Sequence, residues 1–495
     1  MTTSISLRRG QYRDSVALMQ VSRELGASTG VRTAFVAMAT ELNLELAATM
    51  GFEPPPGASP HDMVVALDAD DAASLAHATD LLEQLLSARA ATTGTGSEHP
   101  APRTVRSGAR QAPEANLAVI SLPGSGVLAE AMDALEAGLS VLIFSDNVPV
   151  EDEVRLKDQA RERGLLVMGP DCGTAMVNGV GLGFANVVRP GPVGLVAASG
   201  TGAQHLMCLL DAAGVGVRHC LGVGGRDLSA AVQGRSTLQA LDILAADDAT
   251  ELIVVVSKPA APEVAEQINQ RAAQVGKPVL LSVLGPDQPD LTTTAAAVAR
   301  AAGVDWAEPQ SWPASQERIR VYGHLRGLYS GGTLCDEAML IASAALGRVS
   351  SNIPLEPQWA LPSDLRSLGH VMIDFGADEL TRGRPHPMID ATLRLERLAA
   401  EAADPTCGVL LLDVVLGHAA HPDPAAELAP AIRAALRRAR DADRDLAVVI
   451  ALVGTDGDPQ GLRRQADALV AAGASVHRSN AAAARKALKL LGVAP

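Results

Sequence analysis

Aromatic side chains are scarce in this chain. Five Phe, three Trp and three Tyr make up 2% of its 495 residues, whereas hydrophobic residues of all kinds reach 47%. The interior must therefore be built from Ala, Val and Leu, and such small side chains suit helices packed closely on parallel strands. Proteins that bind single-stranded nucleic acids rely on aromatic stacking platforms. The shortage of aromatic residues argues against that class of protein.

Basic residues are outnumbered as well: 41 Lys and Arg stand against 56 Asp and Glu, which gives a net charge of -15. No run of basic residues is long enough to follow a phosphate backbone. We therefore expect no nucleic-acid partner. Net charge describes the whole surface and not a single cleft, so a local basic or glycine-rich pocket can still hold a small anionic substrate.

Cysteine is rare too, and its five positions are scattered: Cys172, Cys208, Cys220, Cys335 and Cys407. They form no CxxC pair and no zinc-site spacing, which predicts a reducing compartment and no metal site. The N-terminus lacks the apolar core of roughly 7 to 15 residues that a signal peptide needs. No stretch approaches the roughly 20 apolar residues of a membrane span. We expect a cytoplasmic protein without a membrane partner.

The length predicts about three domains, because a domain has roughly 150 residues. Short strands alternate with helices over 1–190, which predicts a Rossmann-like α/β domain with a parallel sheet. The segment 91–113 is small, polar and contains proline, so we interpret it as a flexible insertion in that domain. Pro190-Gly191-Pro192 punctuates the chain. Two further α/β sets follow at 191–305 and 320–495. The pattern predicts strands at 117–121, 140–145 and 165–168 with helices at 127–137 and 150–163, and further strands at 193–197, 218–222, 252–257 and 279–283.

The last two sets share one layout, which suggests an internal repeat. Each begins with a short strand, continues through a Ser/Gly/Thr turn and then forms a helix that ends at a glycine. The pair Gly200-Thr201 occupies this turn in the first copy, and Gly332-Thr333 occupies it in the second. Each copy later has an apolar strand that runs into a polar or charged residue, Lys258 in one and Asp413 in the other.

The two turns are candidates for an anion site. Ser199, Gly200, Thr201 and Gly202 follow an apolar strand and open a helix, and Gly331, Gly332 and Thr333 do the same in the second copy. The free backbone N–H groups and the positive end of a helix favour an anion. We expect the two termini to face one pocket that holds a phosphate or carboxylate. The alternative is that both are tight turns capped by Ser or Thr.

Further candidates for substrate binding follow strands of the first two domains. Asn147, Asp171 and Cys172 lie where ligands of open α/β sheets bind, at the carboxyl edge. Cys172 is either a nucleophile or a structural thiol. Gly225 and Arg226 belong to a glycine-rich loop, where the guanidinium offers two parallel donors to a carboxylate or phosphate. A structural ion pair is the alternative for Arg226.

Catalytic candidates lie in the third domain. Arg384 and His386 belong to a polar loop with two prolines, a shape that suits anion binding or proton transfer. Asp413 ends a strand that has the apolar composition of a buried one. His421 follows His418 by three residues, but the neighbouring prolines break any helix that would align the two for a metal. Turn and capping roles are therefore the favoured interpretation for His418, while a functional role stays open for His386 and His421.

Several runs of residues resemble the FdrA family over nearly the whole chain: Asp146-Asn147-Val148, Gly169-Pro170-Asp171-Cys172-Gly173-Thr174, Gly224-Gly225-Arg226-Asp227, Gly383-Arg384-Pro385-His386-Pro387-Met388 and Gly10-Gln11-Tyr12-Arg13-Asp14-Ser15. That family is similar to the α subunit of succinyl-CoA synthetase. The resemblance implies a CoA-binding-type Rossmann domain over 1–190, followed by flavodoxin-like ligase domains over 191–305 and 320–495.

In succinyl-CoA synthetase two helix termini embrace a phosphohistidine that carries phosphate between subunits. The resemblance implies that the Thr201 and Thr333 turns correspond to those termini. The sequence departs from this pattern at one point, because it has no histidine between His219 and His324. The carrier histidine is therefore missing.

FdrA-type proteins are also assigned as a subunit of oxamate carbamoyltransferase, which acts with two other polypeptides in anaerobic allantoin breakdown. The resemblance thus implies a transferase that moves a carbamoyl group between phosphate and oxamate or a related amide. Carbamoyl phosphate or phosphate would then be a substrate, Arg226 or Arg384 would clamp a carboxylate, and His386 or His421 would move a proton. The alternatives are an acyl-CoA synthetase subunit that binds CoA and a non-catalytic scaffold subunit. Other subunits, or further copies of this chain, are the expected protein partners.

Overall fold

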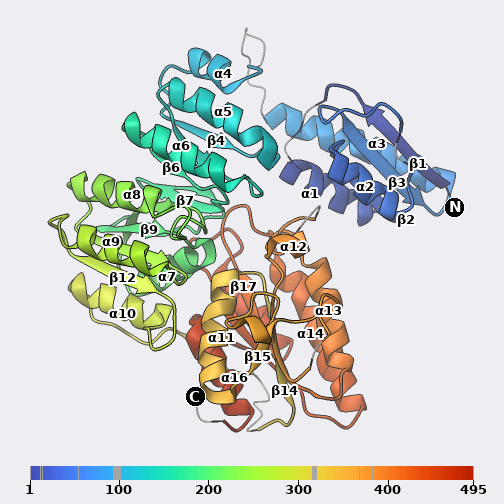
Figure 1. Ribbon diagram of the computed structural model, residues 1–495. Coiled ribbons are helices and arrows are strands. Elements are labelled where there is room, and N and C mark those ends of the chain that lie inside the picture. The colour runs from blue at the N-terminus through green and yellow to red at the C-terminus, as the bar shows by residue number, and fades with distance from the viewer. Residues whose placement is uncertain are drawn as a thin grey trace. The chain divides into compact units, whose positions relative to one another are not determined.

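The computed structural model describes residues 2–493 except 12, 14, 54, 93–101, 315–319, 367 and 382–383. The chain divides into two compact units (Figure 1). The first comprises Met1–Pro113 with Thr381–Pro385, and the second comprises Glu114–Leu380 with His386–Pro495. Each unit is described by itself. None of the helices in the described ranges is long and apolar enough to cross a membrane.

The first unit is built on a three-stranded sheet, β1 (Thr2–Arg8), β3 (Met63–Ala69) and β2 (Val31–Met38), in that order. The central strand β3 runs antiparallel to both neighbours. Its alternate side chains face opposite sides of the sheet. Val65 packs with residues of α1 (Ser15–Gly26) and α3 (Ala72–Thr92), while Ala66 packs with Ala47 of α2 (Glu41–Thr49). Helices therefore cover both faces.

This arrangement corrects the expectation of one parallel sheet over 1–190. Strand–helix alternation fits a parallel βαβ unit, but it also fits a split unit in which a third strand lies antiparallel between the other two. β3 takes that middle place, so the first unit has a sheet of its own. Of the expected insertion at 91–113, residues 93–101 lie outside the described ones. The rest includes a short helix, α4 (Val105–Gln111), with a capping box between Thr104 and Ser107.

The second unit begins with a parallel sheet of three strands in the order β4 (Leu117–Ile120), β5 (Ser140–Ile143) and β6 (Val167–Met168). Two helices connect them, α5 (Gly124–Glu136) and α6 (Val150–Glu162). These elements lie within a few residues of the strands and helices that the sequence pattern predicts. The carboxyl ends of the three strands share one edge of the sheet, where ligands of open α/β folds bind.

The next sheet has six strands in the order β12-β11-β9-β10-β7-β8. Four are parallel: β9 (Val193–Ala197), β10 (Val217–Gly222), β11 (Leu252–Ser257) and β12 (Val279–Val283). The hairpin β7 (Thr174–Val177) and β8 (Val180–Gly183) adds antiparallel to β10. Residues 174–183 therefore extend this sheet and do not close the preceding one. The helices are α7 (Gly200–Ala212), α8 (Arg235–Ala246), α9 (Pro262–Ala272) and α10 (Leu291–Ala301).

The last sheet has seven strands in the order β13-β19-β18-β17-β14-β16-β15. They are β13 (Ser311–Trp312), β14 (His324–Tyr329), β15 (Val349–Ser351), β16 (His370–Asp374), β17 (Cys407–Val415), β18 (Ala447–Val453) and β19 (Ser475–His477). Its helical segments are α11 (Gly332–Leu346), η1 (Pro357–Trp359), α12 (Asp378–Thr381), α13 (Thr392–Ala403), α14 (Pro424–Asp441), α15 (Leu462–Ala471) and α16 (Asn480–Leu490).

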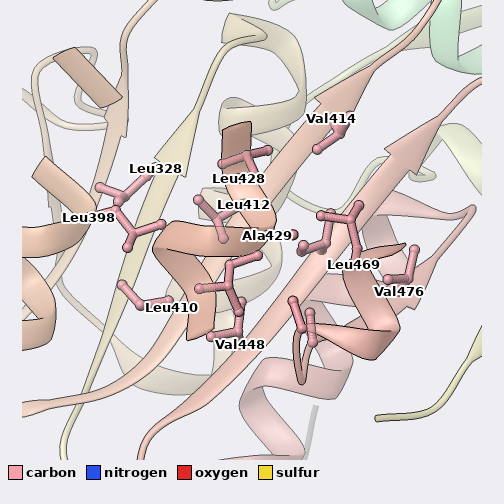
Figure 2. Close-up of a cluster of buried hydrophobic side chains, with 14 of the residues drawn as sticks. Leu328, Leu398, Leu410, Leu412, Val414, Leu428, Ala429, Val448, Leu469 and Val476 are labelled. Carbon is pink, nitrogen blue, oxygen red and sulfur yellow. The ribbon is translucent and has the colours of Figure 1, made fainter. Parts of the chain in front are cut away.

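Strands β17 and β18 are buried along their whole lengths. Apart from Asp413 in β17, both consist of apolar residues, as expected for central strands of a parallel sheet with both faces covered. Figure 2 shows Leu410 and Leu412 of β17 with Val448 of β18 in the cluster that also takes in Leu428 of α14 and Leu469 of α15. This core holds the strand ends, and hence the loops that follow them, in place.

In each of the two larger sheets the strand that leads into the Ser/Gly/Thr turn lies between two later strands. β9 lies between β10 and β11, and β14 lies between β16 and β17. The orders differ in detail, because β10 directly follows β9 along the chain, whereas β15 follows β14 but pairs with β16. In open parallel sheets, ligands bind at this switch point, beyond the carboxyl ends of the strands. The turns at Ser199 and Ser330 follow the first strands directly.

Candidate functional site

The two turns that begin α7 and α11 touch each other. Ser199 Oγ lies 2.7 Å from Thr333 Oγ1, and both side chains are buried. A Cβ at Gly202 would lie 2.9 Å from Thr333 Cγ2, and one at Gly331 would lie 2.8 Å from Thr201 Oγ1. Only glycine allows so close an approach at these two positions. The structure thus brings together the residues of both copies that the sequence singled out.

Most of the first N–H groups at this junction have no partner. Ser199 Oγ accepts from Gly202 N at 3.1 Å and caps α7. Gly331 at the start of α11 provides no side-chain cap. Within the described part of the chain, the N–H groups of Gly200, Thr201, Gly332 and Thr333 donate to no protein atom. Uncapped donors at the positive ends of two helices form a site that favours an anion.

Asp413 supports the second turn from the neighbouring strand β17. Its carboxylate accepts from Ser330 N at 2.7 Å, Ser330 Oγ at 2.9 Å and Gly331 N at 2.8 Å. Arg394 Nη1 lies 3.1 Å from the same carboxylate, and both side chains are buried. Because these donors surround Asp413, it holds the turn and does not face a substrate. The predicted catalytic role therefore becomes a positioning role.

Three residues that the sequence did not single out as site residues surround the start of α11. Lys258 Nζ lies 2.9 Å from Asp336 Oδ2. A Cβ at Gly332 would lie 3.4 Å from Lys258 Nζ and 2.7 Å from Asp374 Oδ2. Lys258 and Asp374 each follow or end a strand at the carboxyl edge, and that position is the signal that could have identified them.

The charges of these residues follow from their surroundings. Burial lowers the pKa of Lys258, but Asp336 and Asp374 outweigh it and raise that pKa. Burial raises the pKa of Asp336 and so disfavours the ionised carboxylate that an ion pair with Lys258 needs. The Lys258 side chain stays 41% exposed, so its ammonium remains charged and the contact is an ion pair. Burial raises the pKa of Asp374 to about 7, so this carboxyl is protonated in part near neutral pH.

His386 lies beside Asp374. A Cβ at Gly376 would lie 2.9 Å from His386 Nε2 and 3.1 Å from Asp374 Oδ1. His386 Nδ1 accepts from Met388 N at 3.3 Å. The centroid of its ring lies 5.5 Å from the centroid of the Phe184 ring, and the two planes are tilted by 42°. Burial lowers the pKa of His386 to about 4, so the ring is neutral at neutral pH. With Nδ1 accepting, the proton belongs on Nε2, where it can serve a substrate.

The other two catalytic candidates have different surroundings. Arg384 belongs to the first unit and has an exposed side chain. Its neighbour Gly383 lies outside the described residues. His421 Nε2 lies 3.2 Å from Glu427 Oε1, and His421 Nδ1 accepts from Asp423 N at 3.0 Å. His421 also lines a small cavity of about 20 Å³ beside Arg394. These contacts tie His421 to the turn at Asp423 and to Glu427.

Arg226 is engaged within the protein. Arg226 Nη2 donates to Val148 O at 2.8 Å and lies 3.0 Å from Glu153 Oε2. Glu153 Oε1 and Asp227 Oδ1 each lie 2.7 Å from the buried Lys157 Nζ. The structural ion pair that we considered for Arg226 is therefore present. Removing Lys157 would leave the buried carboxylates of Glu153 and Asp227 without their shared cation.

Asp171 lies near Gly225: a Cβ added at that glycine would be 4.0 Å from Asp171 Oδ2. Surrounding protein, followed by the carboxylates of Asp378 and Asp146, raises the pKa of Asp171 to about 7. Because solvent still reaches this side chain, we give more weight to repulsion from the two carboxylates. Asp171 is thus a candidate proton donor or acceptor.

Cys172 and Asn147 are placed differently from Asp171. The Cys172 thiol is buried, donates to Thr174 O at 3.4 Å and fills space against Gly222. Burial raises its pKa to about 12, so the thiol stays protonated and is no nucleophile. Asn147 has a positive φ of 52° and an exposed side chain. Its carbonyl oxygen packs against Gly124 at the start of α5, where a Cβ would collide with it.

Two family models match parts of the chain. One, described as AllF, heavy metal-associated domain, matches residues 1–102, and a CoA-ligase model matches residues 328–490. The second match begins at the end of β14, directly before the turn that opens α11. The fold, the turn and the match together place the chain among α/β proteins with a CoA-ligase domain.

The chain belongs to the family of the uncharacterized protein YahF of Escherichia coli (strain K12). The two are 38% identical over 496 residues, which cover 96% of this chain and 95% of that protein. The succinate–CoA ligase [ADP-forming] subunit alpha-2 of Trichomonas vaginalis is 27% identical over 36% of this chain and 58% of its own length. The corresponding alpha 2 subunit of Archaeoglobus fulgidus is 28% identical over 38% of this chain and 66% of its own length. The match thus spans less than two thirds of each ligase subunit.

Among solved structures, the ATP citrate lyase of Methanothrix soehngenii in complex with citrate and coenzyme A aligns with a TM-score of 0.33 and 19% identity. The alignment covers 41% of this chain and 37% of that chain.

These matches correct the expected carbamoyltransferase activity. The CoA-ligase model and the succinate–CoA ligase subunits point to a ligase relationship and not to a transferase. Most of the motifs behind the FdrA resemblance lie in turns at strand ends. Such turns belong to the shared fold, and fold does not determine the reaction.

The heavy metal-associated description of residues 1–102 does not fit the residues present there. Soft heavy metals are bound chiefly by thiolates, and the first cysteine of the chain is Cys172. Among the described residues, no three His, Cys, Asp or Glu side chains are grouped so as to hold a metal ion. We therefore derive no chemistry through a metal.

Proposed function

We propose that this chain is a CoA-binding subunit of an acyl-CoA ligase-like enzyme. The observation that carries the proposal is the contact between the two helix starts, Ser199 Oγ to Thr333 Oγ1 at 2.7 Å. It joins the first copy to the segment 328–490 that matches the CoA-ligase model. The similar succinate–CoA ligase chains are named alpha subunits, so we propose that a partner subunit completes the enzyme.

The chemistry of acyl activation suits this junction. Activation of a carboxylate and its transfer to a thiol pass through groups that carry negative charge on oxygen, and such charge is stabilised by donors fixed in advance. The free N–H groups of Gly200, Thr201, Gly332 and Thr333 are donors of this kind. His386 Nε2 and the carboxyl of Asp374 lie at the edge of the same region and can supply or take up a proton.

Residues beside the sheet β4-β5-β6 fit the phosphates of CoA. Helix α5 begins at Gly124 after Pro123, which gives no side-chain cap. Gly126 N donates to Pro123 O at 2.8 Å, so the N–H groups of Gly124 and Ser125 are the ones available to a pyrophosphate. Asn147 O packs against Gly124, so only glycine fits there, and nothing lies within 4 Å of a Cβ at Gly126. Bound CoA would supply the thiol that accepts the acyl group. This chain would hold its phosphates at α5.

Calorimetric titration of the full chain with CoA tests the proposal. Gly126→Asp places a negative charge beside the phosphates, and we expect it to weaken CoA binding at least tenfold. Gly126→Ala is the matched control, because a methyl group meets open space there, and it should bind CoA as the unaltered chain does. Absence of CoA binding by the unaltered chain, or equal binding by the Asp variant, would refute the proposal.

A further inference from the structure

Two neighbouring strands of the last sheet begin in the same way, with a glycine followed by a histidine. Gly323 precedes His324 at the start of β14, and Gly369 precedes His370 at the start of β16. The two imidazole rings meet edge to face, with their centroids 4.9 Å apart. This His324–His370 pair lies at the amino edge of the sheet, whereas the candidate site lies at the carboxyl edge of the same strands.

His370 holds the start of β14 by a hydrogen bond that only a neutral ring can make. His370 Nδ1 accepts from Leu325 N at 3.0 Å. Because Nδ1 accepts, the proton of the neutral ring lies on Nε2. An imidazolium carries protons on both nitrogens and accepts no hydrogen bond. Protonation of His370 therefore removes the acceptor of a strand N–H group.

A buried guanidinium lies beside the pair. Arg326 of β14 donates to the carbonyl oxygen of Gly369, directly before His370. Arg326 Nε lies 2.8 Å from Glu401 Oε2 of α13, and its Nη2 lies 3.0 Å from Asp404 Oδ2. Both carboxylates are thus engaged with Arg326. A proton on either imidazole would add a second positive charge next to this guanidinium.

The other groups that face the pair offer little to balance such a charge. Burial, followed by the charges of His324 and Arg326, lowers the pKa of His370 to about 4. Burial and Arg326 also lower the pKa of His324, and only Asp404 opposes them. Cys407 of β17 lies in register with His324, and burial raises the pKa of its thiol to about 12. Strand β15, which pairs with β16, contains no titratable side chain.

We propose that the His324–His370 pair is an acid-sensitive latch, which holds β14 to β16 while both rings are neutral and releases the start of β14 when they are protonated. Both strands lead to the candidate site, because β14 runs into the turn at Ser330 and β16 ends at Asp374. Opening of the latch at the amino edge therefore loosens the strands that position these two residues. The inference is independent of CoA binding.

The direction of the response follows from the pKa of His370, which is about 4 in the closed latch and returns to its ordinary value of about 6.5 when the latch opens. The closed latch is fully favoured above the ordinary pKa. Between the two values, the ratio of open to closed latch rises about tenfold for each unit by which the pH falls.

Hydrogen–deuterium exchange of the full chain tests the latch, with rates corrected for the intrinsic effect of pH. Between pH 7.5 and pH 5, peptides from β14 and β16 should lose protection by about tenfold or more, while peptides from β18 keep theirs. His370→Asn supplies an amide oxygen that accepts from Leu325 N without titrating, so its β14 should stay protected at pH 5. The matched control is His77→Asn on the exposed side of α3, which should respond as the unaltered chain does.

The proposal is overturned if β14 and β16 keep their protection down to pH 5, or if β18 loses protection to the same extent. A pH response in His370→Asn equal to that of the unaltered chain also overturns it. If thermal unfolding shows that His370→Asn does not fold, His324→Phe decides, since it keeps an aromatic edge but cannot become charged. A smaller acid response in His324→Phe supports the latch, and an unchanged response refutes it.

Discussion

The starts of α7 and α11 occupy matched places in the two copies but are held by different means. Helix α7 is capped by its own residue Ser199. Helix α11 begins at a glycine, and Asp413 of the adjacent strand accepts the preceding N–H groups in place of a cap. One turn is thus determined locally and the other by a tertiary contact. The second turn therefore depends on the buried pair of Asp413 and Arg394.

The interior of the same two helices shows a second difference. Asn480 N, at the start of α16, donates to His205 Nε2 of α7 at 3.2 Å. Leu291 N, at the start of α10, donates to Glu337 Oε1 of α11 at 2.7 Å. Each copy thus accepts the first N–H of the last helix of the other copy. An imidazole performs this task in one copy and a carboxyl group in the other, so the two junctions respond oppositely to pH.

The largest expected effect comes from removing the tertiary support of α11. Asp413→Ala leaves Arg394 buried without its partner, and such changes cost roughly 3–5 kcal/mol of unfolding free energy. Ser257 ends β11 at the matched position, and Ser257→Ala should cost about 1 kcal/mol or less. Urea unfolding measures both. Similar losses in the two variants would show that the two turns are not supported differently.

The next effect is the opposite pH dependence of His205 and Glu337. Burial lowers the pKa of His205 to about 4, so the folded state favours the neutral ring. Its contribution is complete above the ordinary pKa and is lost as the pH falls from about 6.5 toward 4, on the order of 3 kcal/mol in all. Burial raises the pKa of Glu337 to about 7. Its contribution is complete below the ordinary pKa and is lost as the pH rises from about 4.5 to 7.

Unfolding free energies of His205→Gln and Glu337→Gln, measured between pH 4 and 8 relative to the unaltered chain, check both signs. In the His205 variant the unfolding free energy should fall less than in the unaltered chain as the pH drops toward 4. In the Glu337 variant it should fall less as the pH rises toward 7. Parallel pH profiles in the two variants and the unaltered chain would contradict the assignment.

The smallest effect concerns the contact between the turns. Ser199→Ala removes a helix cap and should cost about 1 kcal/mol. Thr333→Val removes only a hydrogen bond and should cost about 0.5–1.5 kcal/mol. Because the two side chains touch, the double variant should cost less than the two single losses combined. A double-mutant cycle with no coupling would mean that the turns do not rely on each other.

Much of the second unit could be predicted from local pattern. The strands at 193–197, 252–257 and 279–283 appear at the expected residues, because apolar runs between turn residues record burial in their own composition. The hairpin of β7 and β8 was missed, since its pairing with β10 depends on residues well separated in sequence. The antiparallel sheet of the first unit was missed for the same reason.

The candidate site divides in the same way. Ser199, Gly200, Thr201 and the second turn were predicted, because a helix start after an apolar strand has a recognisable composition. Lys258 was not, because it reaches Gly332 across the boundary between the copies. Asp374 was not, because it approaches Gly332 from the end of β16, a strand well separated from that glycine in sequence. Arg226 carries the right chemistry for an anion, but the structure pairs it with Glu153.

By itself the sequence determined most of the elements of the second unit, the matched layout of its two copies and the scarcity of aromatic and cysteine side chains. Each of these depends on which residues are neighbours along the chain. Only the tertiary structure decided that the strands of the first unit run antiparallel, that α7 meets α11 and that Lys258 lies beside them. These depend on the pairing of strand edges and on side chains that reach between domains, and local composition carries no record of either.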